Sequence, residues 1–180
     1  MTITRLPIVG VMGSGTESHT ERAQEVGRWL AQEGVHLLTG GGGGVMSAVS
    51  QAFAETPERT GMIIGIIPSA SDDPCSGPKA GYPNPWVEIP IRTHLPLSGT
   101  RGTDPLSRNH INILSSDVLI ALPGSAGTAS EVSLALQYRR PLVAYLDTRS
   151  DIEGLPAEAR MESDFQRVQA FVRSCLATSS

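Results

Sequence analysis

The chain has 180 residues, which is enough for one domain with a sizeable hydrophobic core. Its net charge is −4 and it contains no basic run, so nucleic acid and membrane surfaces are poor candidates for its main partner. No apolar run approaches the length of a membrane span, the first residues do not form a signal peptide, and two cysteines suggest no disulfide framework. We therefore expect a soluble, cytoplasmic protein.

Strand-like and helical patterns alternate through the first third of the chain. In order, they are a strand at 6–12, a helix from 18, a strand at 35–39, a helix at 45–54 and a strand at 61–67. Ser18 and Glu21 have the spacing of a capping box at the start of the first helix, and Gly34 is a natural stop after it. The third strand is apolar throughout, which is typical of a parallel strand buried on both faces.

The pattern is interrupted at 68–104, where proline and glycine are dense and only 86–91 looks strand-like. A loop of this length is usually functional, and we interpret it as an insertion or a lid. The elements expected after it are a helix at 106–115, a strand at 117–122, a helix at 128–138, a strand at 141–146 and a last helix at 158–176. The alternation predicts an α/β fold: one Rossmann-like, doubly wound domain over residues 1–180, with a mostly parallel sheet and helices on both faces.

Three glycine-bearing turns follow three of the predicted strands. In an open α/β sheet the ligand binds outside the carboxyl ends of the strands, and glycines there let backbone N–H groups approach a phosphate. The alternative is that these glycines only make tight turns. The candidate phosphate-binding residues are Gly13, Ser14, Gly15, Gly41, Gly42, Gly43, Gly44, Gly124, Ser125, Ala126, Gly127 and Thr128.

Two ionisable residues are the candidates for chemistry. Glu131 lies four residues after Gly127, near the start of a helix, where a carboxylate either favours the helix dipole or acts beside a bound phosphate. Arg108 is expected in the first turn of its own helix, an unfavourable place for a cation unless an anionic ligand is bound there. Its alternative role is that of a surface arginine extending to solvent.

Several specific motifs are absent from the chain. There is no Gly-Lys-Ser/Thr of a P-loop, the glycines from Gly10 to Gly15 do not have the dinucleotide spacing, and no acidic residue ends the second strand. The histidines and cysteines do not have the spacing of metal ligands. We expect neither nicotinamide chemistry nor a metal site.

The run Pro123-Gly124-Ser125-Ala126-Gly127-Thr128-Ala129-Ser130-Glu131 resembles the P-G-G-x-G-T-x-x-E motif of the LOG superfamily, often labelled "possible lysine decarboxylase". Gly44-Val45-Met46 resembles the end of its G-G-x-x-G-L-M motif. Characterised members of that superfamily are nucleoside 5′-monophosphate phosphoribohydrolases, and small members form dimers or tetramers. The resemblance therefore implies a homodimer or homotetramer, with Arg108 and Glu131 as catalytic residues if the protein is an enzyme.

A nearer resemblance is to the molybdenum cofactor carrier branch. The corresponding residues are Arg108, Asn109, Ile111, Asn112, Leu114, Ser115 and Ser116, followed by Gly127-Thr128-Ala129 and Glu131-Val132-Ser133-Leu134-Ala135-Leu136. Two features depart from the pattern: Ser125 replaces the second motif glycine, and the proline-rich run at 81–86 looks like an insertion. The only lysine, Lys79, lies outside every matched motif, which argues against a pyridoxal-phosphate decarboxylase.

Two main functions remain open at this point, and a third possibility is a nucleotide or phosphosugar sensor that acts through an oligomer. The first is binding or carrying of a phosphorylated small molecule, which the resemblance implies is the molybdenum cofactor, an anionic pterin. The alternative is hydrolysis of the N-glycosidic bond of a nucleoside 5′-monophosphate, with Glu131 stabilising a ribosyl cation and Arg108 orienting the substrate. Neither function requires a resident cofactor.

Overall fold

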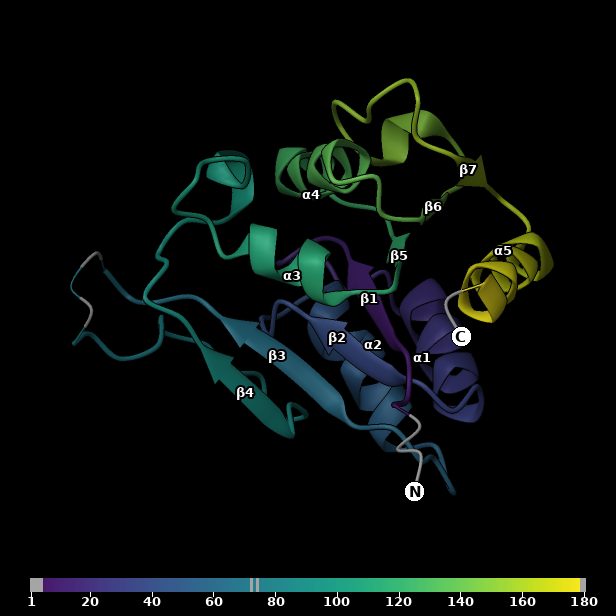
Figure 1. Ribbon diagram of the computed structural model, residues 1–180, viewed down its shortest axis with the longest axis horizontal. Coiled ribbons are helices and arrows are strands. Elements are labelled where there is room, and N and C mark those ends of the chain that lie inside the picture. The colour runs from purple at the N-terminus through teal and green to yellow at the C-terminus, as the bar shows by residue number, and fades with distance from the viewer. Residues whose placement is uncertain (1–4, 72, 74, 179–180) are drawn as a thin grey trace.

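The computed structural model describes residues 5–71, 73 and 75–178. Within this part of the chain, seven parallel strands form one sheet in the order β4-β3-β2-β1-β5-β6-β7 (Figure 1). The strands are β1 (Ile8–Met12), β2 (His36–Thr39), β3 (Ile63–Ile67), β4 (Ile89–Arg92), β5 (Val118–Ala121), β6 (Leu142–Tyr145) and β7 (Met161–Glu162). The predicted fold class, a single Rossmann-like α/β domain, is confirmed.

Helices cover both faces of the sheet. They are α1 (Thr20–Gln32), α2 (Val45–Ala54), α3 (Asn109–Ser115), α4 (Ala126–Gln137) and α5 (Phe165–Thr178), with short 3-10 turns η1 (Gly99–Arg101) and η2 (Arg149–Asp151). Helices α1, α2 and α5 lie on one face, and α3 and α4 lie on the other (Figure 1). None of the helices in the described ranges has the length and apolar character needed to cross a membrane.

Successive side chains along the strands point to opposite faces of the sheet and form two apolar cores, one on each face. Val9 and Val11 of β1 point toward α1, α2 and α5, whereas Met12 belongs to the core under α3 and α4. The close contact of α1 with α2 depends on a missing side chain, because a Cβ at Gly27 would lie 2.5 Å from the carbonyl oxygen of Val49. These cores fix the sheet and hence the positions of the turns at its edge.

Four expected helix starts differ from the structure. Helix α3 begins at Asn109 rather than at 106, and α4 begins at Ala126 rather than at 128. Helix α1 begins at Thr20 after a left-handed His19 and has no side-chain cap, because the Ser18 hydroxyl bonds the Thr20 hydroxyl instead of forming the expected capping box. The last helix begins at Phe165 rather than at 158. The residues before it form strand β7, and the Asp164 carboxylate accepts a hydrogen bond from the Gln166 N–H group (2.8 Å), which caps the helix.

The order of the strands places three turns side by side. Strand β1 pairs with β2 on one side and with β5 on the other, so the direction of winding changes at β1. In doubly wound sheets this is the point where a crevice opens outside the carboxyl ends of the strands. The turns after β1, β2 and β5 are the three glycine-bearing turns of the sequence.

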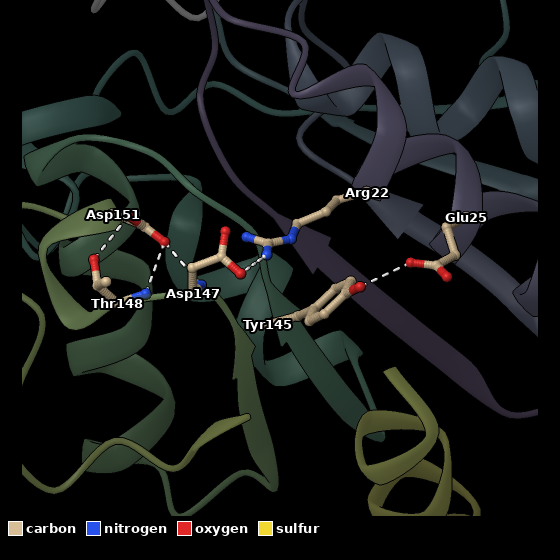
Figure 2. A network of polar contacts seen from close by, with 6 residues as sticks. All are labelled: Arg22, Glu25, Tyr145, Asp147, Thr148 and Asp151. Atoms are coloured by element: carbon tan, nitrogen blue, oxygen red, sulfur yellow. Dashed lines mark hydrogen bonds and ion pairs between the residues drawn. The ribbon is translucent and has the colours of Figure 1, made fainter. Parts of the chain in front are cut away.

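A polar network holds the segment after β6 in place (Figure 2). The Tyr145 hydroxyl donates to Glu25 of α1 (2.8 Å), and Asp147 forms an ion pair with Arg22 of the same helix. The Asp151 carboxylate accepts the N–H groups of Asp147 and Thr148. The carbonyl oxygen of Asp151 in turn accepts the N–H group of Gly124 (2.9 Å), so this segment supports the turn after β5.

Candidate functional site

A cavity of about 140 Å³ lies at the carboxyl ends of β1 and β5. Its lining combines an apolar side with a polar side. The lining residues are Met12, Gly13, Gly15, Met46, Tyr82, Ser98, Gly99, Arg108, Asn109, Ser125, Gly127, Thr128 and Glu131. A shallower hollow of about 420 Å³ shares Gly15 and Ser125 with the cavity and continues toward His19 and Asp151.

Ser14 joins the three glycine-bearing turns. Its N–H group donates to the carbonyl oxygen of Pro123 (3.0 Å), and its carbonyl oxygen accepts the N–H group of Val45 (2.9 Å). Its hydroxyl accepts the N–H group of Glu17 (2.9 Å). Ser14 therefore has a structural role, since its polar groups are used to hold the turns together.

The start of α4 faces the cavity. Ser125 is the N-cap residue, but its side chain makes no cap hydrogen bond, so its hydroxyl is available. The N–H groups of Thr128 and Ala129 donate to the Ser125 carbonyl oxygen, whereas those of the first two helical residues have no intrahelical acceptor. A Cβ at Gly124 would overlap the Thr128 hydroxyl, so this turn requires glycine. The result is an arrangement of donors that suits an anion.

Arg108 is buried, with 3% of its surface exposed. It lies at the N-cap of α3, and its guanidinium donates to Asn109 Oδ1 (3.2 Å). Among the described residues, its Nε atom has no hydrogen-bond partner. A guanidinium carries five N–H donors, and leaving them unpaired inside a protein is costly. The alternative of a surface arginine is therefore wrong, and Arg108 contributes a buried positive charge directly before the first turn of α3.

Glu131 lies on α4 one turn after Gly127 and is 9% exposed. Its Oε1 atom is 3.9 Å from Arg108 Nη1 and accepts a hydrogen bond from Asn112 Nδ2 (3.3 Å). Burial raises the pKa of Glu131, and the Arg108 charge and the Asn112 hydrogen bond oppose this shift only in part. The cavity thus holds one cation and one carboxyl group whose pKa is raised by burial.

Residues 82–99, which belong to the 68–104 segment, cover the cavity and the turn after β2. The N–H group of Asn84 donates to the Gly41 carbonyl oxygen (2.7 Å), and its side-chain amide donates to that of Gly42 (2.9 Å). Tyr82 lies against Gly42 and lines the cavity. Ser98 and Gly99 of the same segment line it from the side of α4. This segment therefore has the position of a lid.

The structure brings together about half of the expected site residues. Those that line the cavity are Gly13, Gly15, Arg108, Ser125, Gly127, Thr128 and Glu131. Those that do not line it are Ser14, Gly41, Gly42, Gly43, Gly44, Gly124 and Ala126. Gly41 and Gly42 are covered by Asn84 and Tyr82, so these two do not face an open anion site.

Two further residues contact the candidate site residues or line the cavity, Asn112 and Tyr82, and only Asn112 has a signal in the sequence. Asn112 follows Arg108 by four residues, which is the spacing of one helix face, and both side chains reach Glu131. Tyr82 has no such signal, because its place depends on how a long irregular segment folds back.

Within the described ranges, no group of three or more His, Cys, Asp or Glu residues is placed to hold a metal ion.

Comparisons with known proteins agree with this architecture. A family model described as the SLOG cluster4 family matches residues 6–171. The chain belongs to the SLOG cluster4 family. A relative in Archaeoglobus fulgidus, itself uncharacterised, is 30% identical over 97% of this chain and 98% of its own length.

Two solved structures are similar over nearly their full length. The molybdenum cofactor binding protein from Rippkaea orientalis has a TM-score of 0.72 and 30% identity, covering 97% of this chain and 99% of that one. The molybdenum cofactor carrier protein from Chlamydomonas reinhardtii has a TM-score of 0.70 and 31% identity, also covering 97% and 99%. This SLOG cluster4 chain therefore resembles carriers of the molybdenum cofactor.

Proposed function

We propose that this protein binds and carries an anionic, phosphorylated small molecule, and that the molecule is the molybdenum cofactor. The observation that carries the proposal is the buried guanidinium of Arg108, whose Nε atom has no partner among the described residues. An anion in the cavity would satisfy these donors and balance the charge. The similarity to two molybdenum cofactor proteins at about 30% identity supports the choice of ligand.

The size of the cavity suggests how such a ligand would lie. About 140 Å³ is less than the roughly 300–1,000 Å³ of pockets that enclose a drug-sized molecule. The phosphate would occupy this cavity, against Arg108, Thr128 and the first N–H groups of α4. The rest of the molecule would pass Gly15 and Ser125 into the neighbouring hollow, which has room for a ring.

The proposal is tested by measuring molybdenum and pterin in protein purified from cells that make the cofactor. We expect both to accompany the wild-type protein and to be lost from the Arg108→Gln variant. Arg28→Gln is the matched control, because Arg28 is exposed on α1. Thermal unfolding of each variant separates loss of binding from loss of fold. Absence of molybdenum and pterin from the wild-type protein, together with failure to take up added cofactor, would refute the carrier function.

A second candidate function is hydrolysis of nucleoside 5′-monophosphates, supported by the carboxyl group of Glu131 in the same cavity as Arg108. A carboxylate beside the ribose could stabilise the oxocarbenium-like transition state. Chromatography of free base after incubation with a panel of nucleoside 5′-monophosphates tests this, with Glu131→Gln as the control. Base release that disappears in the variant would favour the enzyme over the carrier.

The expected homodimer or homotetramer is also part of the proposal. Arg139 and Arg140 follow the end of α4, where a cation can have an interface role or a structural role. The guanidinium of Arg140 donates to the Leu114 carbonyl oxygen at the end of α3 (2.8 Å), which supports the structural role for that residue. Multi-angle light scattering would determine the oligomeric state, and a monomer would remove the expected assembly.

A further inference from the structure

Asn112 is a buried neighbour of Glu131, and only one of its two polar side-chain atoms has a hydrogen-bond partner among the described residues. Its side chain is completely buried, and its Nδ2 atom donates to Glu131 Oε1 (3.3 Å). Its Oδ1 atom has no hydrogen-bond donor in the part of the chain that the structure describes. A buried acceptor without a partner costs about 1–3 kcal/mol. A nearby hydrogen-bond donor to Asn112 Oδ1 would therefore be stabilising.

An ionised carboxylate cannot be that donor, because it only accepts hydrogen bonds. A neutral carboxylic acid has an O–H group as well as a carbonyl oxygen. A neutral Glu131 side chain can therefore donate its O–H group to Asn112 Oδ1 while still accepting from Asn112 Nδ2. This pairing of acid with amide satisfies both polar atoms of Asn112, which the ionised form cannot do.

Few charges surround Glu131. Arg108 faces it from the start of α3, and α4 itself carries no other charged residue. Strands β5 and β6 beneath α4 contain no charged residue, and Tyr82 is the other titratable side chain of the cavity. On the other packed elements, Arg101 of η1 pairs with Asp104. The remaining group on α3, His110, bonds Tyr138 beyond the end of α4.

An anion in this cavity would compete with Glu131 for the one buried cation. Two like charges that share Arg108 repel each other strongly where water is excluded. Protonation of Glu131 removes that repulsion, and burial already raises the pKa of this carboxyl group. The proton can come from solvent, so the only change is conversion of the carboxylate to the acid.

We infer that binding of an anion at Arg108 causes the Glu131 carboxylate to take up one proton. The resulting O–H group then donates a hydrogen bond to Asn112 Oδ1. The inference rests on the proposed binding of a phosphorylated ligand in this cavity. Asn112 is then a positioning residue for the neutral form of Glu131. At pH values where Glu131 is ionised in the free protein, ligand affinity falls tenfold for each unit of increase in pH, because one proton is bound with each anion. The protein would thus release its ligand more easily as pH rises.

Isothermal titration calorimetry with sulfate and with adenosine 5′-monophosphate tests the inference. Sulfate does not titrate near neutral pH, and the phosphate of the nucleotide is already a dianion at pH 8. Any proton taken up on binding at pH 8 is therefore taken up by the protein. Titrations in two buffers of different ionisation enthalpy give the number of protons. We expect close to one for the wild-type protein and for Glu21→Gln, a control exposed on α1. We expect none for Glu131→Gln.

The Asn112→Ala variant examines the positioning role. This variant should lower the pH at which ligand affinity begins to decrease, because the neutral Glu131 side chain loses its amide partner. Wild-type binding without proton uptake, or equal uptake by Glu131→Gln, would overturn the inference and leave the proposed anion site intact. Failure of the wild-type protein to bind either probe would overturn the anion site and the inference together.

Discussion

The guanidinium group of Arg108 occupies the space that a side chain at Gly40 would fill. An ideal Cβ atom at Gly40 would overlap the Arg108 Cζ and Nη atoms. Gly40 directly follows β2, so the end of this strand supports a side chain that comes from the start of α3. The glycine after β2 therefore contributes to the site by making room for Arg108, without facing the ligand itself.

Gly40→Ala should displace Arg108 and weaken anion binding tenfold or more, while lowering the free energy of unfolding by about 1–3 kcal/mol. Calorimetry with sulfate and urea unfolding would measure the two effects. Gly77→Ala is the matched control, because its added Cβ would have no atom of the described residues within 4 Å apart from those of its chain neighbours. Unchanged affinity in Gly40→Ala would mean that Arg108 can move aside without loss of the anion site.

Asn84 makes three hydrogen bonds, two to the turn after β2 and one within the covering segment. Two of them go to the carbonyl oxygens of Gly41 and Gly42, and the third is accepted by Asn84 Oδ1 from the Trp86 N–H group (3.1 Å). Asn84→Ala removes both side-chain bonds and leaves the buried Gly42 carbonyl oxygen without that donor. This change should destabilise the fold by about 1–3 kcal/mol.

Limited proteolysis together with urea unfolding would show whether that loss also loosens the covering segment. We expect faster cleavage within 68–104 in Asn84→Ala than in the wild-type protein. Lys79→Ala in the same segment should behave like the wild type, because the Lys79 side chain is exposed. Equal cleavage rates for all three proteins would show that Asn84 does not hold the segment closed.

The sequence predicts the sheet and most helices because each has a local pattern. Residues 45–54 have helical periodicity and a run of glycines before them, and α2 has these same bounds. The all-apolar run at 61–67 contains β3. Strand β7 was missed because Met161–Glu162 is only two residues long, too short for alternation to be visible.

The site was less predictable than the fold, for a physical reason. Glycine-rich turns mark the carboxyl ends of strands, but sequence spacing does not say which turn is covered by another segment. Gly41 and Gly42 were expected to face a phosphate, and Asn84, more than 40 residues later, covers them. The burial of Arg108 likewise depends on Gly40, which follows β2 and is far away in the sequence, so this contact has no local signal.

Glu88 should make the edge of the sheet sensitive to acid. Its carboxylate accepts two hydrogen bonds from Arg59 and one from the Ile63 N–H group (2.9 Å). The hydrogen bonds from the Arg59 side chain hold the pKa of Glu88 below its usual range. A lowered folded-state pKa stabilises the protein above the unfolded pKa of about 4.3, and this contribution is lost as pH falls through the folded value.

Glu88→Gln should therefore lower the free energy of unfolding by roughly 1 kcal/mol at pH 7, and by progressively less as pH falls below about 4.3. Urea unfolding of both proteins across this range would measure the difference. Exposed Glu153 supplies the control, since Glu153→Gln should leave stability unchanged at every pH. A constant difference between wild type and Glu88→Gln down to pH 3 would exclude the charge as its cause.

Glu131 should affect stability in the opposite direction. Because burial raises its folded-state pKa, its ionisation opposes folding, and the stability present at low pH is lost as pH rises through the folded value. Glu131→Gln keeps the shape but cannot ionise, so it should be more stable than the wild type at pH 8, by on the order of 1 kcal/mol. The gap should close as pH falls toward the range where wild-type Glu131 is neutral. Urea unfolding without any added anion measures this, and a variant less stable than the wild type at pH 8 would show that the pair with Arg108 outweighs the cost of burial.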